Sequence, residues 1–292
     1  MGPIHETLGS LLSTSAVTIT YVFLASTMFS IGLAVTVDEF FTALRDLKLM
    51  GRIVLANILL VPILGMLLVK LFPLSADTRI AILLLAITPG GMQAIQFTAK
   101  VRGAVSFAAA VTFLLSIIGV LASPLLADLI LPLETRVRFP WLHAMGYVLL
   151  FLLLPLLVGF AVRYGKRRLA EGLGKPVLLL SNISFVATIA LSMAVRGTAI
   201  RAIGWAGLGA MAFLIVSSMA IGWWLGGPDQ GKRQVSAVAT SMRNAAVCLL
   251  IAVTSFPGRG VETAVVSFMA LMVPPNMLLT LYRGLRTRRR PS

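Results

Sequence analysis

The chain has 292 residues, of which 58% are hydrophobic and 12% are charged, and its mean hydropathy is +0.96. A soluble domain of ordinary composition has about twice this share of charged residues, so the composition excludes a typical soluble fold. The net charge of +15 comes from basic residues that lie mainly in short gaps between apolar runs. They form no interleaved basic and aromatic face, which argues against a nucleic-acid partner.

Nine apolar runs follow one another, separated by gaps that contain proline, glycine and charged residues. A bilayer core about 30 Å thick needs about 20 apolar residues per helix, and backbone polar groups inside it must be bonded. We therefore predict an all-α polytopic membrane protein with about nine transmembrane helices and no soluble domain. The runs are Ala16–Thr36, Ile53–Phe72, Ile80–Ala99, Ala104–Leu131, Trp141–Val162, Val177–Val195, Ile203–Leu225, Val235–Phe256 and Val261–Tyr282.

Lysine and arginine are divided unevenly between alternate gaps. Seventeen lie in one set of gaps, seven in the other, and the last of the 25, Arg243, lies inside the eighth run. Because basic residues are retained on the cytoplasmic side, this asymmetry predicts an outside N-terminus and a cytoplasmic C-terminus. The expected location is the plasma or inner cell membrane. No basic n-region precedes the first run, so we expect that run to act as the insertion signal.

Two runs contain residues that interrupt helices in mid-membrane. Pro89-Gly90-Gly91 removes a backbone donor and adds two flexible residues to the third run. The eighth run carries Arg243 and Asn244 at a depth where polar groups are costly. Broken helices in corresponding places indicate a substrate site between inverted repeats, where half-helix N-termini favour an anionic ligand.

These features also have structural interpretations. Pro89-Gly90-Gly91 could be a packing kink, and Arg243 could snorkel or pair with another helix. Small polar side chains often bond neighbouring helices in membrane bundles. That alternative stays open for Asn57, Asn182, Ser184 and Asn276.

The residues that usually relay protons are missing from the apolar runs. All ten acidic residues lie in gaps or at helix ends, and His5 and His143 are terminal or interfacial. A membrane-centre carboxylate that could titrate is therefore not expected. No set of nucleophile, base and orienting group is apparent, so the sequence does not predict an enzyme, and no cofactor is expected.

Several short motifs occur in the order found in one transporter family. Phe29-Ser30-Ile31-Gly32-Leu33 resembles the family's F-x-x-G-L segment, Pro89-Gly90-Gly91 its P-G-G break, and Ser123-Pro124-Leu125-Leu126 its S-P-L-L. Arg243-Asn244 stands where the motif E-x-G-x-Q-N ends. The chain thus resembles the bile acid:sodium symporter family, within the wider group of bile acid, arsenite and auxin transporters.

The resemblance implies an inverted-repeat transporter with a panel, a core and two crossed broken helices. Residues 1–292 would form one integral membrane domain. The core would comprise about residues 53–131 and 203–282, and the panel about residues 16–36 and 141–195.

The chain departs from the family at its sodium-ligand positions. The resemblance aligns those positions with Ala94, Ile95 and Ala239, which offer no side-chain oxygen, and places Arg243 where the family has glutamine. A fixed guanidinium would repel a sodium ion nearby. We therefore expect no metal ion at the usual sites.

The favoured hypothesis is a secondary transporter of a small organic anion, a carboxylate or sulfonate, with Arg243 as a fixed cation facing the substrate. A conventional sodium-coupled symporter of organic anions is the first alternative. A membrane sensor or scaffold that does not transport is the second. The predicted substrate-binding residues are Thr88, Gly90, Gly91, Met92, Gln93, Gln96, Thr240, Ser241, Arg243 and Asn244.

Overall fold

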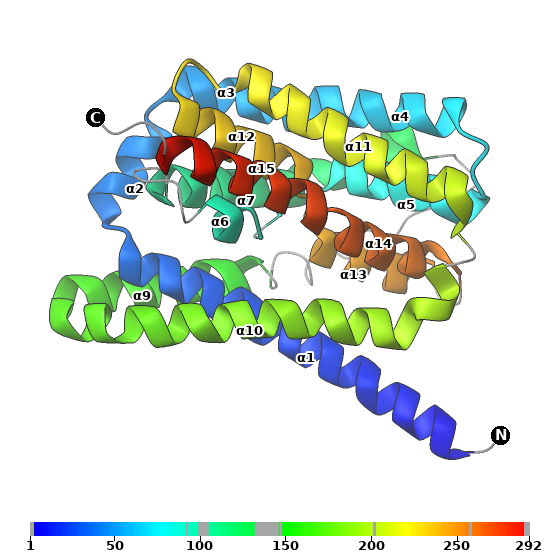
Figure 1. Ribbon diagram of the computed structural model, residues 1–292, viewed down its shortest axis with the longest axis horizontal. Helices are drawn as coiled ribbons and strands as arrows, with labels where there is room; N and C mark the ends of the chain where they lie inside the picture. Colours follow the sequence, from blue (N-terminus) through cyan, green and yellow to red (C-terminus); the bar gives the residue numbers. More distant parts are fainter. Residues whose placement is uncertain are drawn as a thin grey trace. The chain divides into compact units, whose positions relative to one another are not determined.

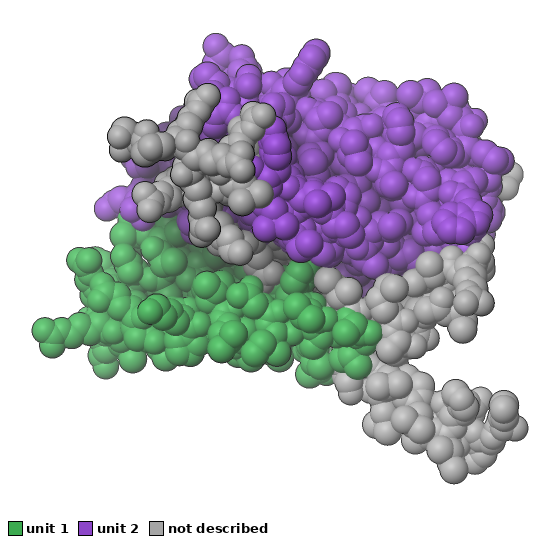
Figure 2. All heavy atoms as spheres, in the orientation of Figure 1, with its two compact units in different colours: residues 1–37, 146–202 green, residues 38–145, 203–292 purple. Residues whose placement is uncertain are grey.

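The computed structural model describes residues 3–91, 93–98, 105–131, 146, 148–200, 203–256 and 259–288. The regular elements in these ranges are all helices, in agreement with the predicted all-α class, and no strand occurs among them (Figure 1). The chain divides into two compact units, coloured separately in Figure 2. Unit 1 comprises residues 1–37 and 146–202, and unit 2 comprises residues 38–145 and 203–292. Their roles as panel and core stay predictions.

Unit 1 is built from α1 (Pro3–Ala34), the π-helix η2 (Val148–Leu153), α9 (Leu154–Gly165) and α10 (Arg167–Ile200). Helices α1 and α9 approach closely at two glycines, because a Cβ built on Gly159 would lie 2.7 Å from the Cα of Gly32. Only a residue without a side chain allows this approach. The glycine of the F-x-x-G-L motif therefore has a packing role here.

Unit 2 contains the two interrupted runs. Its helices are α2 (Val37–Leu44), α3 (Leu47–Leu55), the π-helix η1 (Ala56–Leu60), α4 (Val61–Leu71), α5 (Ala76–Ile87), α6 (Gln93–Thr98), α7 (Val105–Ile130), α11 (Gly204–Leu225), α12 (Gln230–Ser241), α13 (Ala245–Ser255), α14 (Val261–Leu271) and α15 (Val273–Arg288). Short apolar helices such as α5 are buried along most of their length. Their side chains form the hydrophobic interior of unit 2.

Each π-helix lies directly before a helix that carries proline in its first turn. Pro62 follows η1, and Pro155 follows η2. Proline cannot donate a backbone hydrogen bond, so the regular series of helical hydrogen bonds is interrupted near it. Asn57 lies within η1 and is fully buried. The side-chain amide of Asn57 must therefore form its hydrogen bonds inside unit 2.

The predicted count of nine transmembrane helices is not confirmed. Among the described residues, five helices are long and apolar enough to cross a membrane, or six if Tyr21–Ala34 and Val37–Leu44 form one span. The third and eighth predicted runs are each divided into two short helices, so neither half is long enough alone. The fifth predicted run begins at Trp141, outside the described residues. The five spans are Leu47–Leu71, Val105–Ser123, Arg167–Ala187, Gly204–Leu225 and Val261–Tyr282.

Candidate functional site

The first break separates α5 from α6 and follows from the covalent structure of its residues. Helix α5 ends at Ile87, and the backbone from Thr88 to Gly91 is not helical. Pro89 has no N–H to donate, and Gly90 has a φ of +91°, which L side chains rarely adopt. The helix therefore stops here, as the sequence predicts.

The second break separates α12 from α13 and contains neither glycine nor proline. Helix α12 ends at Ser241, and Met242 has extended backbone angles, φ −87° and ψ 115°. Asn244 then caps α13, because its side-chain oxygen accepts a hydrogen bond of 3.2 Å from the Val247 N–H. Asparagine is a favoured N-cap residue, so it fixes where the new helix begins.

The two breaks are hydrogen-bonded to each other through their backbones. The Gly91 N–H donates to the Met242 carbonyl at 3.1 Å, and the Asn244 N–H donates to the Thr88 carbonyl at 2.9 Å. A Cβ on Gly91 would lie 2.7 Å from the Arg243 carbonyl oxygen. Backbone groups freed by one break are thus satisfied by the other, as an apolar environment requires.

Arg243 is fully buried beside these breaks, and its guanidinium is bonded to protein oxygens. Its Nε donates to the Leu85 carbonyl at 2.8 Å, and one terminal nitrogen donates to the Ala86 carbonyl. The other terminal nitrogen donates to Asn57 Oδ1 at 2.7 Å and to the Thr240 carbonyl at 3.3 Å. Four oxygens therefore hold the guanidinium.

The acceptors around Arg243 are all neutral groups. Leu85 and Ala86 lie in the last turn of α5, and Thr240 lies in the last turn of α12. A helix C-terminus carries partial negative charge, so two helix ends stabilise the guanidinium. No carboxylate of the described residues forms a salt bridge with it. Dipoles therefore stabilise the Arg243 guanidinium, and no carboxylate among the described residues pairs with it.

The structure brings together most of the predicted site residues. Thr88, Thr240 and Ser241 are buried, and Asn244 is only 5% exposed. The backbone N–H groups of Gly91 and Asn244 donate to the opposite break. Gly90 packs against Ser116 of α7, whose Oγ donates to the Gly90 carbonyl. Met92 and the side chains of Gln93 and Gln96 lie outside the described residues.

Two asparagines complete the polar cluster, and the sequence left their roles undecided. Asn57 accepts from Arg243 and donates to Thr240 Oγ1 at 3.2 Å. Asn276 in α15 accepts a hydrogen bond of 2.8 Å from the Ser241 hydroxyl. Asn57 stands alone in its apolar run, Asn276 follows Pro274 and Pro275 in its own, and both are fully buried. The sequence signal for the role of Asn57 is Pro62, because a proline disturbs the helix just after this asparagine.

The positions that the resemblance aligns with sodium ligands lie in the two broken helices. Ala94 and Ile95 belong to α6, and Ala239 belongs to α12. All three are buried, with exposed fractions of 1%, 4% and 2%. They present aliphatic surface to the interior of unit 2.

Sequence comparison identifies the family of the chain. The model of the Sodium Bile acid symporter family matches residues 21–204, which include the first break but not the second. A comparison with curated proteins gives no match. Since the family model covers more than half of the chain, this multi-pass membrane protein belongs to the Sodium Bile acid symporter family.

Proposed function

We propose that the chain is a secondary transporter of a small organic anion, a carboxylate or sulfonate, in which the fixed charge of Arg243 replaces a coupling sodium ion. The observation that carries this proposal is the buried guanidinium, which bonds to four neutral oxygens and to no carboxylate of the described residues. Charges interact strongly in a medium of low dielectric constant. An anion near the breaks would therefore be attracted to Arg243.

The oxygens around Arg243 support this assignment. Carbonyl and amide oxygens are the ligand type that hard cations such as sodium prefer. Here a covalently attached cation uses them, so the same oxygens are not free for a mobile ion. Because the charge of Arg243 cannot leave the protein, transport would be passive or by exchange.

The proposal depends on the charge of Arg243 more than on a direct contact. In this structure the guanidinium is fully buried and makes four hydrogen bonds. A bidentate contact with a substrate carboxylate would require some of these bonds to break. Coulomb attraction acts over a longer distance and needs no such change. Substrate contacts by Thr88, Gln93, Gln96 and the other site residues remain part of the proposal.

Ligand-dependent thermal stability tests this function in the purified protein. A library of carboxylates and sulfonates is measured in sodium chloride and in choline chloride, since a ligand that binds the folded state raises the Tm. We expect at least one anion to stabilise the protein equally in both salts. We expect Arg243→Gln to weaken its binding at least about tenfold, because the Coulomb attraction of the fixed charge is lost.

The alternatives give different results in the same assay. A conventional symporter would bind the anion only in sodium chloride, and such a result would overturn the proposal. Stabilisation that is unchanged in Arg243→Gln would also contradict the role of the charge. A sensor or scaffold would bind the anion but show no uptake in proteoliposomes.

A further inference from the structure

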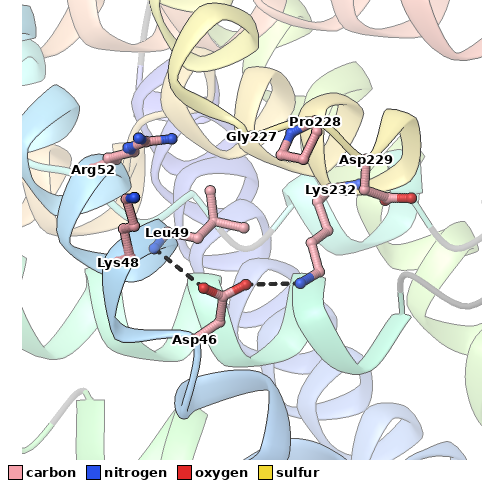
Figure 3. Close-up of a pocket in the computed structure, with 8 residues that line it drawn as sticks. All are labelled: Asp46, Lys48, Leu49, Arg52, Gly227, Pro228, Asp229 and Lys232. Atoms are coloured by element: carbon pink, nitrogen blue, oxygen red, sulfur yellow. Dashed lines mark hydrogen bonds and ion pairs between the residues drawn. The ribbon is translucent and has the colours of Figure 1, made fainter.

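A pocket of about 270 Å³ lies within unit 2, where the start of α3 faces the start of α12. Figure 3 shows Lys48 and Arg52 on the α3 side and Lys232 reaching from α12 toward Asp46. The pocket carries three cationic and two anionic side chains. It is lined by Asp46, Lys48, Leu49, Arg52, Gly227, Pro228, Asp229 and Lys232.

Both carboxylates of the pocket already have partners. Asp46 accepts from the Leu49 N–H at 3.4 Å and from Lys232 Nζ at 2.8 Å. Asp229 accepts from the Lys232 N–H at 2.8 Å and so caps α12. The hydrogen bond from Lys232 lowers the pKa of Asp46, so this carboxylate is charged at neutral pH. Asp46 therefore balances Lys232, and Asp229 serves the helix N-terminus.

Lys48 and Arg52 are not paired in this way, although the charge of Arg52 also acts on Asp46 from a distance. Both are exposed, and neither forms a hydrogen bond or ion pair with another described residue. They stand four residues apart in α3, which puts their side chains on the same face of the helix. Two like charges held side by side at a pocket favour the binding of an anion between them.

The pocket lies at one end of a candidate membrane span, which is the level at which lipid phosphates are expected. The candidate span Leu47–Leu71 begins immediately after Asp46, so Lys48 and Arg52 occupy its first two turns. All three basic residues of the pocket belong to the gaps predicted to be cytoplasmic. Basic pockets at this level of a membrane protein recognise anionic head groups.

We infer that this pocket binds a phosphate group, carried by an anionic lipid or present as free phosphate, through Lys48 and Arg52, with Lys232 adding positive charge beside its ion pair with Asp46. The guanidinium of Arg52 can donate two parallel hydrogen bonds to phosphate oxygens, and the lysines add point charges. The bound group would join the start of α3 to the start of α12. Helix α12 is the half-helix that ends at the second break, yet this inference does not depend on the proposed transport of anions.

Two arms of one stability experiment separate the sources of the phosphate. In detergent, the Tm is measured in potassium phosphate and in potassium chloride of equal ionic strength. In nanodiscs, it is measured in phosphatidylcholine alone and in equal parts of phosphatidylcholine and phosphatidylglycerol. The variant Lys48→Ala/Arg52→Ala is compared with Arg168→Ala/Lys175→Ala, which removes two exposed cations of unit 1 from the same predicted side.

We expect phosphate or phosphatidylglycerol to raise the Tm of the unaltered protein and of the control variant, but not of Lys48→Ala/Arg52→Ala. A shift with inorganic phosphate assigns a free ion, and a shift with phosphatidylglycerol alone assigns a lipid. The inference is overturned if neither probe stabilises the protein, or if the pocket variant responds as strongly as the control. Should the double variant not fold, Arg52→Gln is compared with Arg168→Gln, and the same outcomes apply.

Discussion

The two breaks of unit 2 have similar geometry but different causes. At the first break, Pro89 removes a donor and Gly90 takes a positive φ, so the interruption is encoded locally. At the second break, Met242 and Arg243 are ordinary helix formers. What holds them outside a helix is their contact with other segments, namely the backbone of the first break, the end of α5 and Asn57.

We infer from this difference that the first break acts as a template, which positions the second break. The Gly91 N–H and Thr88 carbonyl are left free by the first break and are bonded by Met242 and Asn244. Arg243 then binds the end of the helix that precedes the first break. Removing contacts made by Arg243 should thus affect the second break more than the first.

Arg243→Met should have the largest effect on stability. It leaves the buried oxygens of Leu85, Ala86 and Asn57 without their charged donor, for a loss of about 2–5 kcal/mol of folding free energy. Hydrogen exchange should accelerate at Asn244–Val247 and change little in α5. Chemical denaturation in detergent gives the free energy of unfolding, with exposed Arg168→Met as control. Equal acceleration at both breaks would contradict the template model.

Gly91→Leu should disturb both breaks together. Its Cβ would meet the Met242 and Arg243 backbone at 2.7 Å, and backbone cannot move aside as a side-chain tip can. Overpacking of this kind costs about 1–3 kcal/mol. The control is Gly51→Leu in α3, where a Cβ meets no atom within 4 Å. A Tm for Gly91→Leu as high as that of the control would show that the two breaks are not in close contact.

Asn244→Ala should have the smallest effect and a local one. It removes the N-cap bond to Val247, which is typically worth about 1 kcal/mol, and keeps the backbone bond from Asn244 to Thr88. The Tm should fall slightly, and exchange should increase only in the first turn of α13. Asn244→Ser is the matched variant, because serine also caps helices and should restore most of the loss. No difference between the alanine and serine variants would exclude capping as the role of Asn244.

The sequence predicts the helical class and the place of each break, but not how the second break is held. Proline and glycine act through their own backbone, so Pro89-Gly90-Gly91 can be recognised from sequence alone. The acceptors of Arg243 come from α5, η1 and α12, which lie far apart in the chain. Backbone carbonyls carry no sequence signal, and Asn57 looks like any isolated polar residue of a membrane helix. The prediction that Arg243 faces a substrate stays untested, whereas its bonds to these oxygens are visible only in three dimensions.

The central claim is that the charge of Arg243 is not neutralised by the protein and attracts the transported anion. Asn57→Asp tests it directly, because a carboxylate would replace the amide whose Oδ1 lies 2.7 Å from the guanidinium. Asn276→Asp is the control, since its carboxylate would accept from Ser241 instead. The measurement is counterflow uptake of the stabilising anion in sodium-free proteoliposomes. We predict that the unaltered protein transports without sodium and that Asn57→Asp loses at least about tenfold in apparent affinity, more than the control. Uptake by Asn57→Asp at the unaltered affinity, or uptake by the parent protein only when sodium is added, would contradict the account.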